Sequence, residues 1–160
     1  MADEENAGLG FALPRGATGF FRPEDGPLPR TDLRAFRTAL SAAARADGGR
    51  VREVEEQAYP RTFHTAAVAG RTGEHVVLCH AHHAWIAFVD ERRMWYRDEF
   101  VEPPVWSETF AHAGFTVLSR KCLRMPLSGV DTSALTPAEW REVRYYGVMV
   151  LGELLFNAWD

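Results

Sequence analysis

The chain has 160 residues, of which 46% are hydrophobic and 25% charged, and its formal net charge at pH 7 is −4. This length and composition are typical of one soluble globular domain and exclude collagen-like, coiled-coil and wholly disordered chains. No apolar run approaches the roughly 18 residues of a membrane span, and no basic stripe is present, so we expect neither membrane insertion nor nucleic-acid binding. The acidic start, MADEENAGLG, lacks the basic and apolar segments of a signal peptide, which predicts a cytoplasmic protein.

Residues 1–30 form an N-terminal arm that is rich in glycine and proline, a composition that disfavours regular secondary structure. Scattered apolar residues such as Leu13 and Phe20 predict that the arm lies across the rest of the protein. We expect the remaining residues, 31–160, to form a single α+β domain.

The first predicted helix covers Asp32–Ala46, with Thr31 as its expected N-cap. Apolar residues recur at helical spacing from Leu33 to Ala43, which predicts one buried face. The two glycines after Asp47 are typical of a helix end.

Short segments of β-type sequence follow the first helix, some alternating in polarity and some continuously apolar. Because they follow one another closely, we expect an antiparallel meander with the first segment at an edge. The predicted strands are Val51–Gln57, Arg61–Ala69, Glu74–His80, Ala84–Val89, Arg92–Arg97 and Phe115–Leu123.

Three helices are expected in the second half of the chain. A short one covers Trp106–Ala113. The residues from Thr136 to Glu139 read T-P-A-E, a capping box with proline at the first helical position, and Gly147 is expected to end that helix. A last helix is expected over Leu151–Trp159. We expect the sheet to pack against the N-terminal helix and these C-terminal helices.

A cluster of candidate metal ligands, Cys79–His83, reads CHAHH, and cysteine and histidine are favoured zinc ligands. His80 and His82 would share one face of a strand, and His64 or His112 would have to complete the site. The spacing lacks both the second ligand pair of a structural zinc site and the His-Glu-x-x-His pattern of zinc proteases. Two interpretations of the cluster therefore remain. One is a small metal-dependent enzyme, and the other is a hairpin turn whose histidines bind no metal.

Other catalytic patterns are missing from the sequence. Cys79 and Cys122 lie in apolar stretches, which predicts buried, reduced thiols, although Arg120 and Lys121 could lower the pKa of Cys122. The chain has no nucleophile elbow, P-loop or dinucleotide-binding fingerprint. We therefore expect no enzymatic activity, no catalytic residue and no cofactor.

The segment of residues 90–106 mixes aromatic residues with arginines and acids. Aromatic residues and arginine are enriched at the energetic centres of protein interfaces, so this segment is a candidate partner-binding surface. The alternative is an ordinary strand with core aromatics and solvated charges. The predicted partner-binding residues are Asp90, Arg92, Arg93, Trp95, Tyr96, Arg97 and Glu99.

The chain closes on Gly152–Asp160, GELLFNAWD. This segment resembles a closing motif, G-E-hydrophobic-hydrophobic-F-N-x-W-D, of small immunity proteins of bacterial polymorphic-toxin systems. It is similar in particular to the group that contains the immunity factor of the tuberculosis necrotizing toxin, whose cognate toxins are secreted NAD glycohydrolases. The resemblance implies a cytoplasmic antitoxin that binds a cognate toxin domain and blocks its active site. It transfers no toxin-contacting residue to this sequence.

The same motif also has a structural interpretation. Leu151, Leu155 and Phe156 would share a helix face with Trp159 nearby, and would dock the last helix on the sheet. We therefore expect the motif to build the fold rather than to contact the partner. An adaptor for some other protein partner remains a further alternative.

Overall fold

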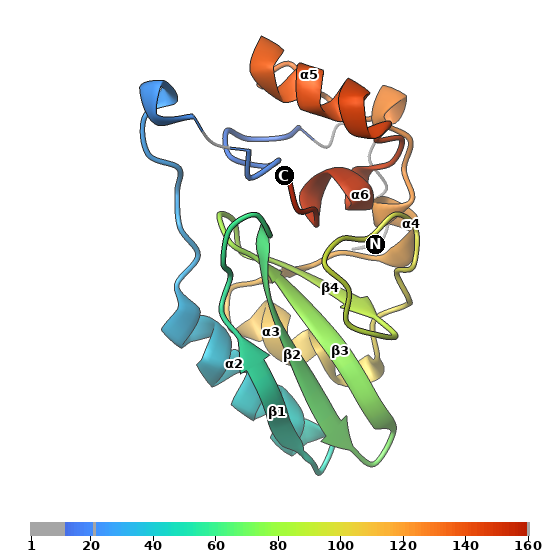
Figure 1. Ribbon diagram of the computed structural model, residues 1–160. Coiled ribbons are helices and arrows are strands. Elements are labelled where there is room, and N and C mark those ends of the chain that lie inside the picture. The colour runs from blue at the N-terminus through green and yellow to red at the C-terminus, as the bar shows by residue number, and fades with distance from the viewer. Residues whose placement is uncertain (1–11, 21, 160) are drawn as a thin grey trace.

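The computed structural model describes residues 12–20 and 22–159 and shows an α+β fold, which confirms the expected fold class. One five-stranded sheet has the order β1-β2-β3-β4-β5, in which the first four strands are antiparallel neighbours and β5 is parallel to β4 (Figure 1). The strands are β1 (Arg50–Glu55), β2 (Phe63–Gly70), β3 (Gly73–His80), β4 (Trp85–Val89) and β5 (Thr116–Val117).

The helices lie on both faces of this sheet, with α2 and α3 on one face and α4 and α6 on the other (Figure 1). They are α2 (Leu33–Ala46), α3 (Glu108–His112), α4 (Arg120–Leu123), α5 (Pro137–Tyr146) and α6 (Leu151–Leu155), with 3-10 turns at Pro23–Asp25, Val105–Ser107 and Leu127–Gly129. Within residues 12–20 and 22–159, no helix is long and apolar enough to cross a membrane.

Local capping signals explain where two helices begin and end. In α5 the Thr136 hydroxyl accepts a hydrogen bond from the Glu139 amide, and the Glu139 carboxylate accepts one from the Thr136 amide. Gly147 ends the helix with φ 67°, as expected. The predicted N-cap of α2 was wrong by one residue: Asp32, not Thr31, accepts hydrogen bonds from the amides of the first turn.

Two predicted strands were wrong. Arg92–Arg97 is an irregular loop, because its residues bond to side chains and to the C-terminal segment rather than to a neighbouring strand. In Phe115–Leu123 only Thr116 and Val117 form a strand, β5, and the Leu118 amide adds one hydrogen bond to the Ile86 carbonyl of β4. The chain then turns into α4, since the Ser119 hydroxyl accepts a hydrogen bond from the Cys122 amide and caps that helix.

The last helix is shorter than predicted, because it ends at Leu155 instead of Trp159. The residues after the helix run alongside the start of β2. There the Asn157 amide donates a hydrogen bond to the Thr62 hydroxyl at 3.0 Å, and Ala158 forms an antiparallel bridge with Arg61. This pairing places residues 156–159 against the sheet as an extended segment.

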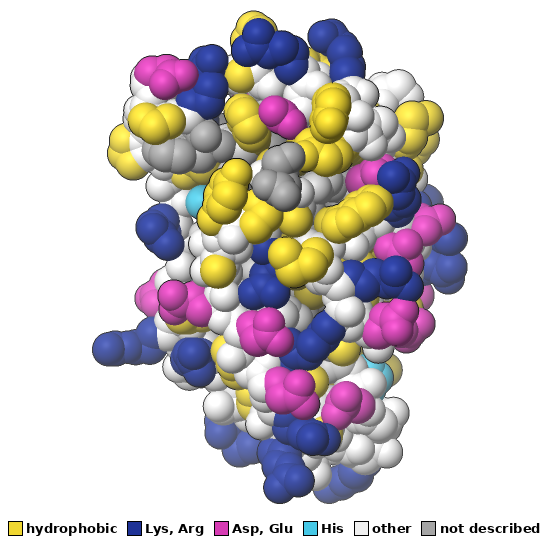
Figure 2. Space-filling model, in the orientation of Figure 1, with side chains coloured by type: hydrophobic (Ala, Val, Ile, Leu, Met, Phe, Trp, Pro, Cys, Tyr) yellow, Lys and Arg dark blue, Asp and Glu magenta, His cyan; other side chains and the backbone are white. Residues whose placement is uncertain are grey.

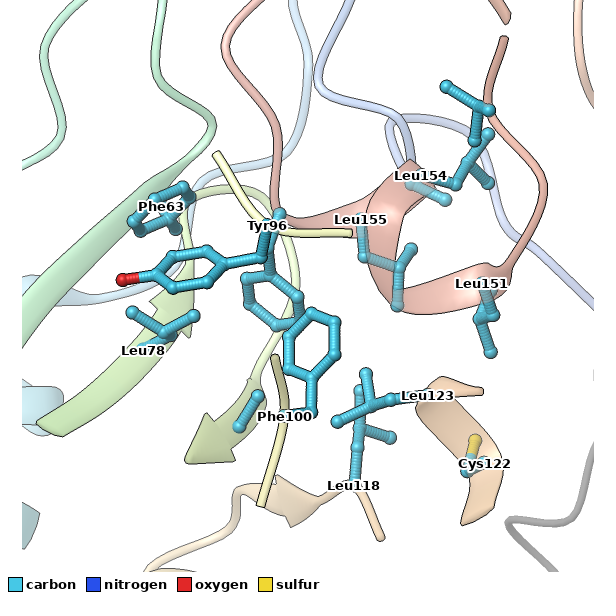
Figure 3. Close-up of a cluster of buried hydrophobic side chains, with 14 of the residues drawn as sticks. Phe63, Leu78, Tyr96, Phe100, Leu118, Cys122, Leu123, Leu151, Leu154 and Leu155 are labelled. Atoms are coloured by element: carbon cyan, nitrogen blue, oxygen red, sulfur yellow. The ribbon is translucent and has the colours of Figure 1, made fainter. Parts of the chain in front are cut away.

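The sheet is buried on both faces, which explains its continuously apolar strands. Val77 and Phe88 point towards Phe36 of α2, while Leu78 points to the opposite face. Figure 3 shows this second core, which joins the sheet to α4, α6 and the loop after β4. It contains Phe63, Leu78, Tyr96, Phe100, Leu118, Leu123, Leu151, Leu154 and Leu155.

Within the described part of the N-terminal arm, residues 12–20 and 22–30, the side chains of Leu13, Ala17 and Phe20 pack on this second core. Leu13 is 3% exposed and its amide donates a hydrogen bond to the Asp131 carbonyl. The Trp159 indole donates a hydrogen bond to the Thr18 carbonyl at 2.5 Å. Residues 1–11 and 21 of the predicted arm lie outside the described residues.

Candidate functional site

The loop of residues 90–99 follows β4, and the side chains of two of its residues fix it to the rest of the protein. Tyr96 is 1% exposed, and its hydroxyl donates a hydrogen bond to the Glu91 carbonyl and accepts one from the Arg93 amide. Arg92 reaches across to β1, where it donates to the Glu53 carbonyl and pairs with the Glu55 carboxylate at 3.0 Å. The loop is therefore fixed to the fold although it has no regular structure.

The opposite side of the same loop faces solvent. Met94 is 53% exposed and Trp95 41% exposed, which is unusual for large apolar side chains. The guanidinium of Arg97 lies 4.7 Å from the centre of the Trp95 ring. An exposed indole covered by a guanidinium is a combination typical of interface anchors.

Arg97 connects this exposed indole to the C-terminal motif. Its guanidinium lies 3.5 Å from the carboxylate of Glu153, a residue of α6 that is only 3% exposed. The other carboxylate oxygen of Glu153 accepts a hydrogen bond from the Met149 amide at 3.0 Å. The motif thus supplies a rigid anion that positions Arg97, and through Arg97 the Trp95 ring.

The structure separates the seven predicted partner-binding residues into two groups. Tyr96 is buried, and Arg92 and Glu99 are half-buried and bonded within the fold, since Glu99 accepts a hydrogen bond from the Arg97 amide. These three support the loop and are not available as principal contacts in this arrangement. The exposed group is Asp90, Arg93, Trp95 and Arg97.

Sequence reasoning missed two residues of this surface. Met149, which is 70% exposed, is linked to it through its backbone amide, which donates to the same Glu153 carboxylate that Arg97 contacts. Glu153 itself is the buried support, and its only sequence signal was a carboxylate that directly precedes the apolar run Leu154–Phe156. The rest of the described motif builds the fold: Phe156 is fully buried, and the Asn157 side chain donates a hydrogen bond to the Glu153 carbonyl.

Figure 2 shows how hydrophobic and charged side chains are distributed on one face of the molecule, in the orientation of Figure 1. Hydrophobic side chains gather over the upper half of this face, where the C-terminal helices and the arm lie, while charged side chains cover the strands below. The apolar surface in this view therefore lies over the C-terminal helices and the arm rather than over the sheet itself.

The histidine turn (residues 80–83) holds the N-terminal arm. His80 is fully buried, and its Nε2 donates a hydrogen bond to the Ala17 carbonyl at 2.8 Å, while its Nδ1 accepts from the amides of His82 and His83. The other two rings bond to the arm as well, His82 to the Pro29 carbonyl and His83 to the Arg15 carbonyl, both at 2.8 Å.

The structure does not bring these histidines together as a metal site. Both ring nitrogens of His80 already have hydrogen-bond partners, and His64 Nδ1 accepts a bond from the Gln57 amide. His112 is exposed in α3, on the other face of the sheet. In residues 12–20 and 22–159, no group of three histidine, cysteine or acidic side chains could hold a metal ion.

Both cysteines are buried free thiols. Burial raises the pKa of Cys79 strongly and raises the pKa of Cys122 to about 11, so both stay protonated near neutral pH. Arg120 and Lys121 are exposed on α4 and do not offset the burial of Cys122. Such thiols are poor nucleophiles and poor metal ligands.

Comparisons with protein-family models, curated proteins and solved structures found no match.

The buried histidines make the fold sensitive to acid. Burial lowers the pKa of His64 to about 4, whereas the unfolded residue titrates near 6.5. Below about pH 6.5 the unfolded state therefore binds a proton that the folded state does not, and stability falls as the pH falls. We expect a loss of roughly 3 kcal/mol between pH 7 and pH 4 from His64 alone, with a further loss from His80.

This prediction is measured by urea unfolding at several pH values. His64→Asn retains an acceptor for the Gln57 amide but does not titrate, so its stability should depend less on pH. His112→Asn, at an exposed position, should behave like the parent protein. Equal pH dependence in all three proteins would contradict the assignment.

Proposed function

We propose that this protein is a cytoplasmic immunity protein, which binds a cognate secreted toxin domain and blocks its active site without chemistry of its own. The observation that carries the proposal is Trp95, an exposed indole held under the Arg97 guanidinium on a loop that is fixed from beneath. Because the loop is already ordered, little conformational entropy is lost when a partner covers it.

The chemistry of the surface indicates what the partner presents. Trp95 and Met94 offer apolar contact area, and Arg93 and Arg97 offer planar hydrogen-bond donors around it. Such a surface fits a toxin cleft that has an apolar pocket for the indole and carboxylates at its edge. The exposed acid Asp90 beside it would favour basic groups at the rim of that cleft, whereas the Glu91 carboxylate is ion-paired with Arg93 at 2.6 Å.

The resemblance of the C-terminal motif to immunity proteins supports the same function and suggests an NAD glycohydrolase as the toxin. In this structure the motif lies mostly in the core, yet its Glu153 contacts Arg97 of the exposed loop. A residue of the motif thus supports the candidate surface indirectly, which is consistent with a motif shared by proteins whose partner-contacting residues differ.

Two alternatives receive less support from the described residues. A metal-dependent enzyme would need histidine nitrogens that are instead bonded to the arm and to the backbone. An adaptor for another partner could use the same exposed loop, and the identity of the neighbouring gene would distinguish it from an immunity protein.

The proposal is tested by producing the protein together with the toxin domain encoded beside it and measuring growth. We expect growth to be restored and a stable one-to-one complex to be isolated. If the toxin domain remains lethal and no complex forms, the proposed function is wrong. If the neighbouring gene encodes no toxin, the adaptor alternative is favoured.

A further inference from the structure

A cavity of about 400 Å³ opens beside the histidine turn, and no residue of the loop 90–99 is among its described lining residues. Its walls come from the N-terminal arm, the loop between β1 and β2, His82 and the C-terminal segment. The described residues that line it are Gly19, Phe20, Pro27, Leu28, Arg30, Gln57, Tyr59, Pro60, Arg61, His82 and Trp159. This volume lies in the range of small-molecule sites in proteins.

The walls of the cavity are held by hydrogen bonds that do not depend on a ligand. His82 Nδ1 donates to the Pro29 carbonyl at 2.8 Å, which fixes the arm, and the Trp159 indole bonds to the Thr18 carbonyl. On the far side, Gln57 Nε2 donates to the Arg61 carbonyl at 2.8 Å. The cavity is therefore preformed.

Its two arginines differ in their bonding. The Arg61 guanidinium donates to the carbonyls of Phe63 and Glu56 and lies 3.4 Å from the Glu55 carboxylate, so its charge is largely neutralised. Arg30 is exposed and forms no ion pair or hydrogen bond with any residue of the described ranges. Arg30 is therefore the cation available to a ligand.

The apolar part of the cavity has an aromatic residue at its edge. Tyr59 is 81% exposed, although its ring offers a large apolar surface, and it lines the same cavity as Phe20 and Trp159. An aromatic ring that is exposed beside a cavity gains most from a flat ligand that stacks on it. Among the described lining residues, none is acidic, so an anion meets no repulsion from them.

We propose that this cavity binds a small aromatic molecule that carries a phosphate or carboxylate group. The ring of the ligand lies against Tyr59 and the apolar walls, and its anionic group meets the Arg30 guanidinium. Gln57 Nε2 and His82 Nδ1 already donate hydrogen bonds to backbone carbonyls. The other polar atom of each side chain, Gln57 Oε1 and His82 Nε2, is left to accept a hydrogen bond from a polar substituent of the ligand. The site is independent of the proposed toxin-binding function, since it uses other residues.

The experiment is a titration of the ¹⁵N-labelled full chain with phenyl phosphate, followed by NMR. We expect saturable shifts of the amide signals of lining residues such as Gly19 and Phe20. Inorganic phosphate, which has the charge without the ring, and benzyl alcohol, which has a ring without charge, should each bind about tenfold more weakly or worse.

Two variants assign the contacts. Arg30→Gln and Tyr59→Leu, both at exposed positions, should each weaken phenyl phosphate binding about fivefold to tenfold. Arg37→Gln removes an exposed arginine of α2 that does not line the cavity and should leave binding unchanged. The proposal is overturned if lining residues do not shift, if inorganic phosphate binds as tightly, or if Arg30→Gln binds like the parent.

Discussion

Replacing Phe156 by alanine should lower the free energy of unfolding by about 3–5 kcal/mol, as for other large-to-small changes in a core. Phe156 is fully buried, and its ring lies about 6 Å from those of Phe63, His80 and Phe100. These neighbours come from β2, β3 and the loop after β4. They therefore cannot fill the space left by the missing Phe156 ring unless the sheet moves. Chemical denaturation followed by circular dichroism measures the loss.

The matched control for this change is Trp95→Ala, which also removes a large aromatic side chain. Because Trp95 is 41% exposed on a loop, its removal should change the free energy of unfolding by less than about 1 kcal/mol. If the two variants lose equal stability, the C-terminal motif does not hold the core together in the way that the structure indicates.

Trp95→Ala should instead weaken binding to the toxin domain by at least about 2 kcal/mol, roughly 30-fold, which is typical of a central interface residue. The expected readouts are a faster dissociation of the complex and a loss of growth rescue at low expression. Tyr145→Ala, at a position that is 81% exposed on α5, is the control and should bind like the parent. Equal binding by both variants would exclude Trp95 as an anchor.

A second variant tests how Trp95 is positioned. Glu153→Gln keeps an oxygen that can accept from the Met149 amide but removes the charge that attracts Arg97. We expect weaker toxin binding than the parent, and a smaller loss from Glu153→Gln in the Trp95→Ala background than in the parent, because part of its effect passes through the Trp95 ring and part through the Arg97 guanidinium itself. Additive losses in this double-mutant cycle would show that Glu153 does not act through Trp95.

The features that could be predicted from sequence were those determined by neighbours in the chain. The capping box at Thr136 and the glycine that ends α5 depend on residues within one or two turns, and both are present as expected. The apolar runs of β3 and β4 predicted buried strands, because a strand covered on both faces has no polar side. Their short connections also made an antiparallel meander the simplest topology.

The periodicity of apolar residues misled where other hydrogen bonds, some distant and some local, decided the conformation. Arg92–Arg97 alternates like a strand, yet Tyr96 bonds to its own loop and its amide donates to the Phe156 carbonyl, far along the chain. Phe115–Leu123 is apolar enough for a strand, but Ser119 caps a helix after two paired residues. In both segments the competing hydrogen bonds involve side chains, which a periodicity of apolar residues does not describe.

By itself the sequence determined the α+β fold class, most of the helices and strands, and the segment that carries an exposed tryptophan. Only the tertiary structure decided what the chemically distinctive residues do. The three histidines of the turn bond to carbonyls of the arm that lie 53 to 68 residues away in the chain. Glu153 of α6 forms an ion pair with Arg97 of the loop after β4. Such contacts depend on how packed elements bring distant residues together, and packing is a property of the whole core rather than of any segment.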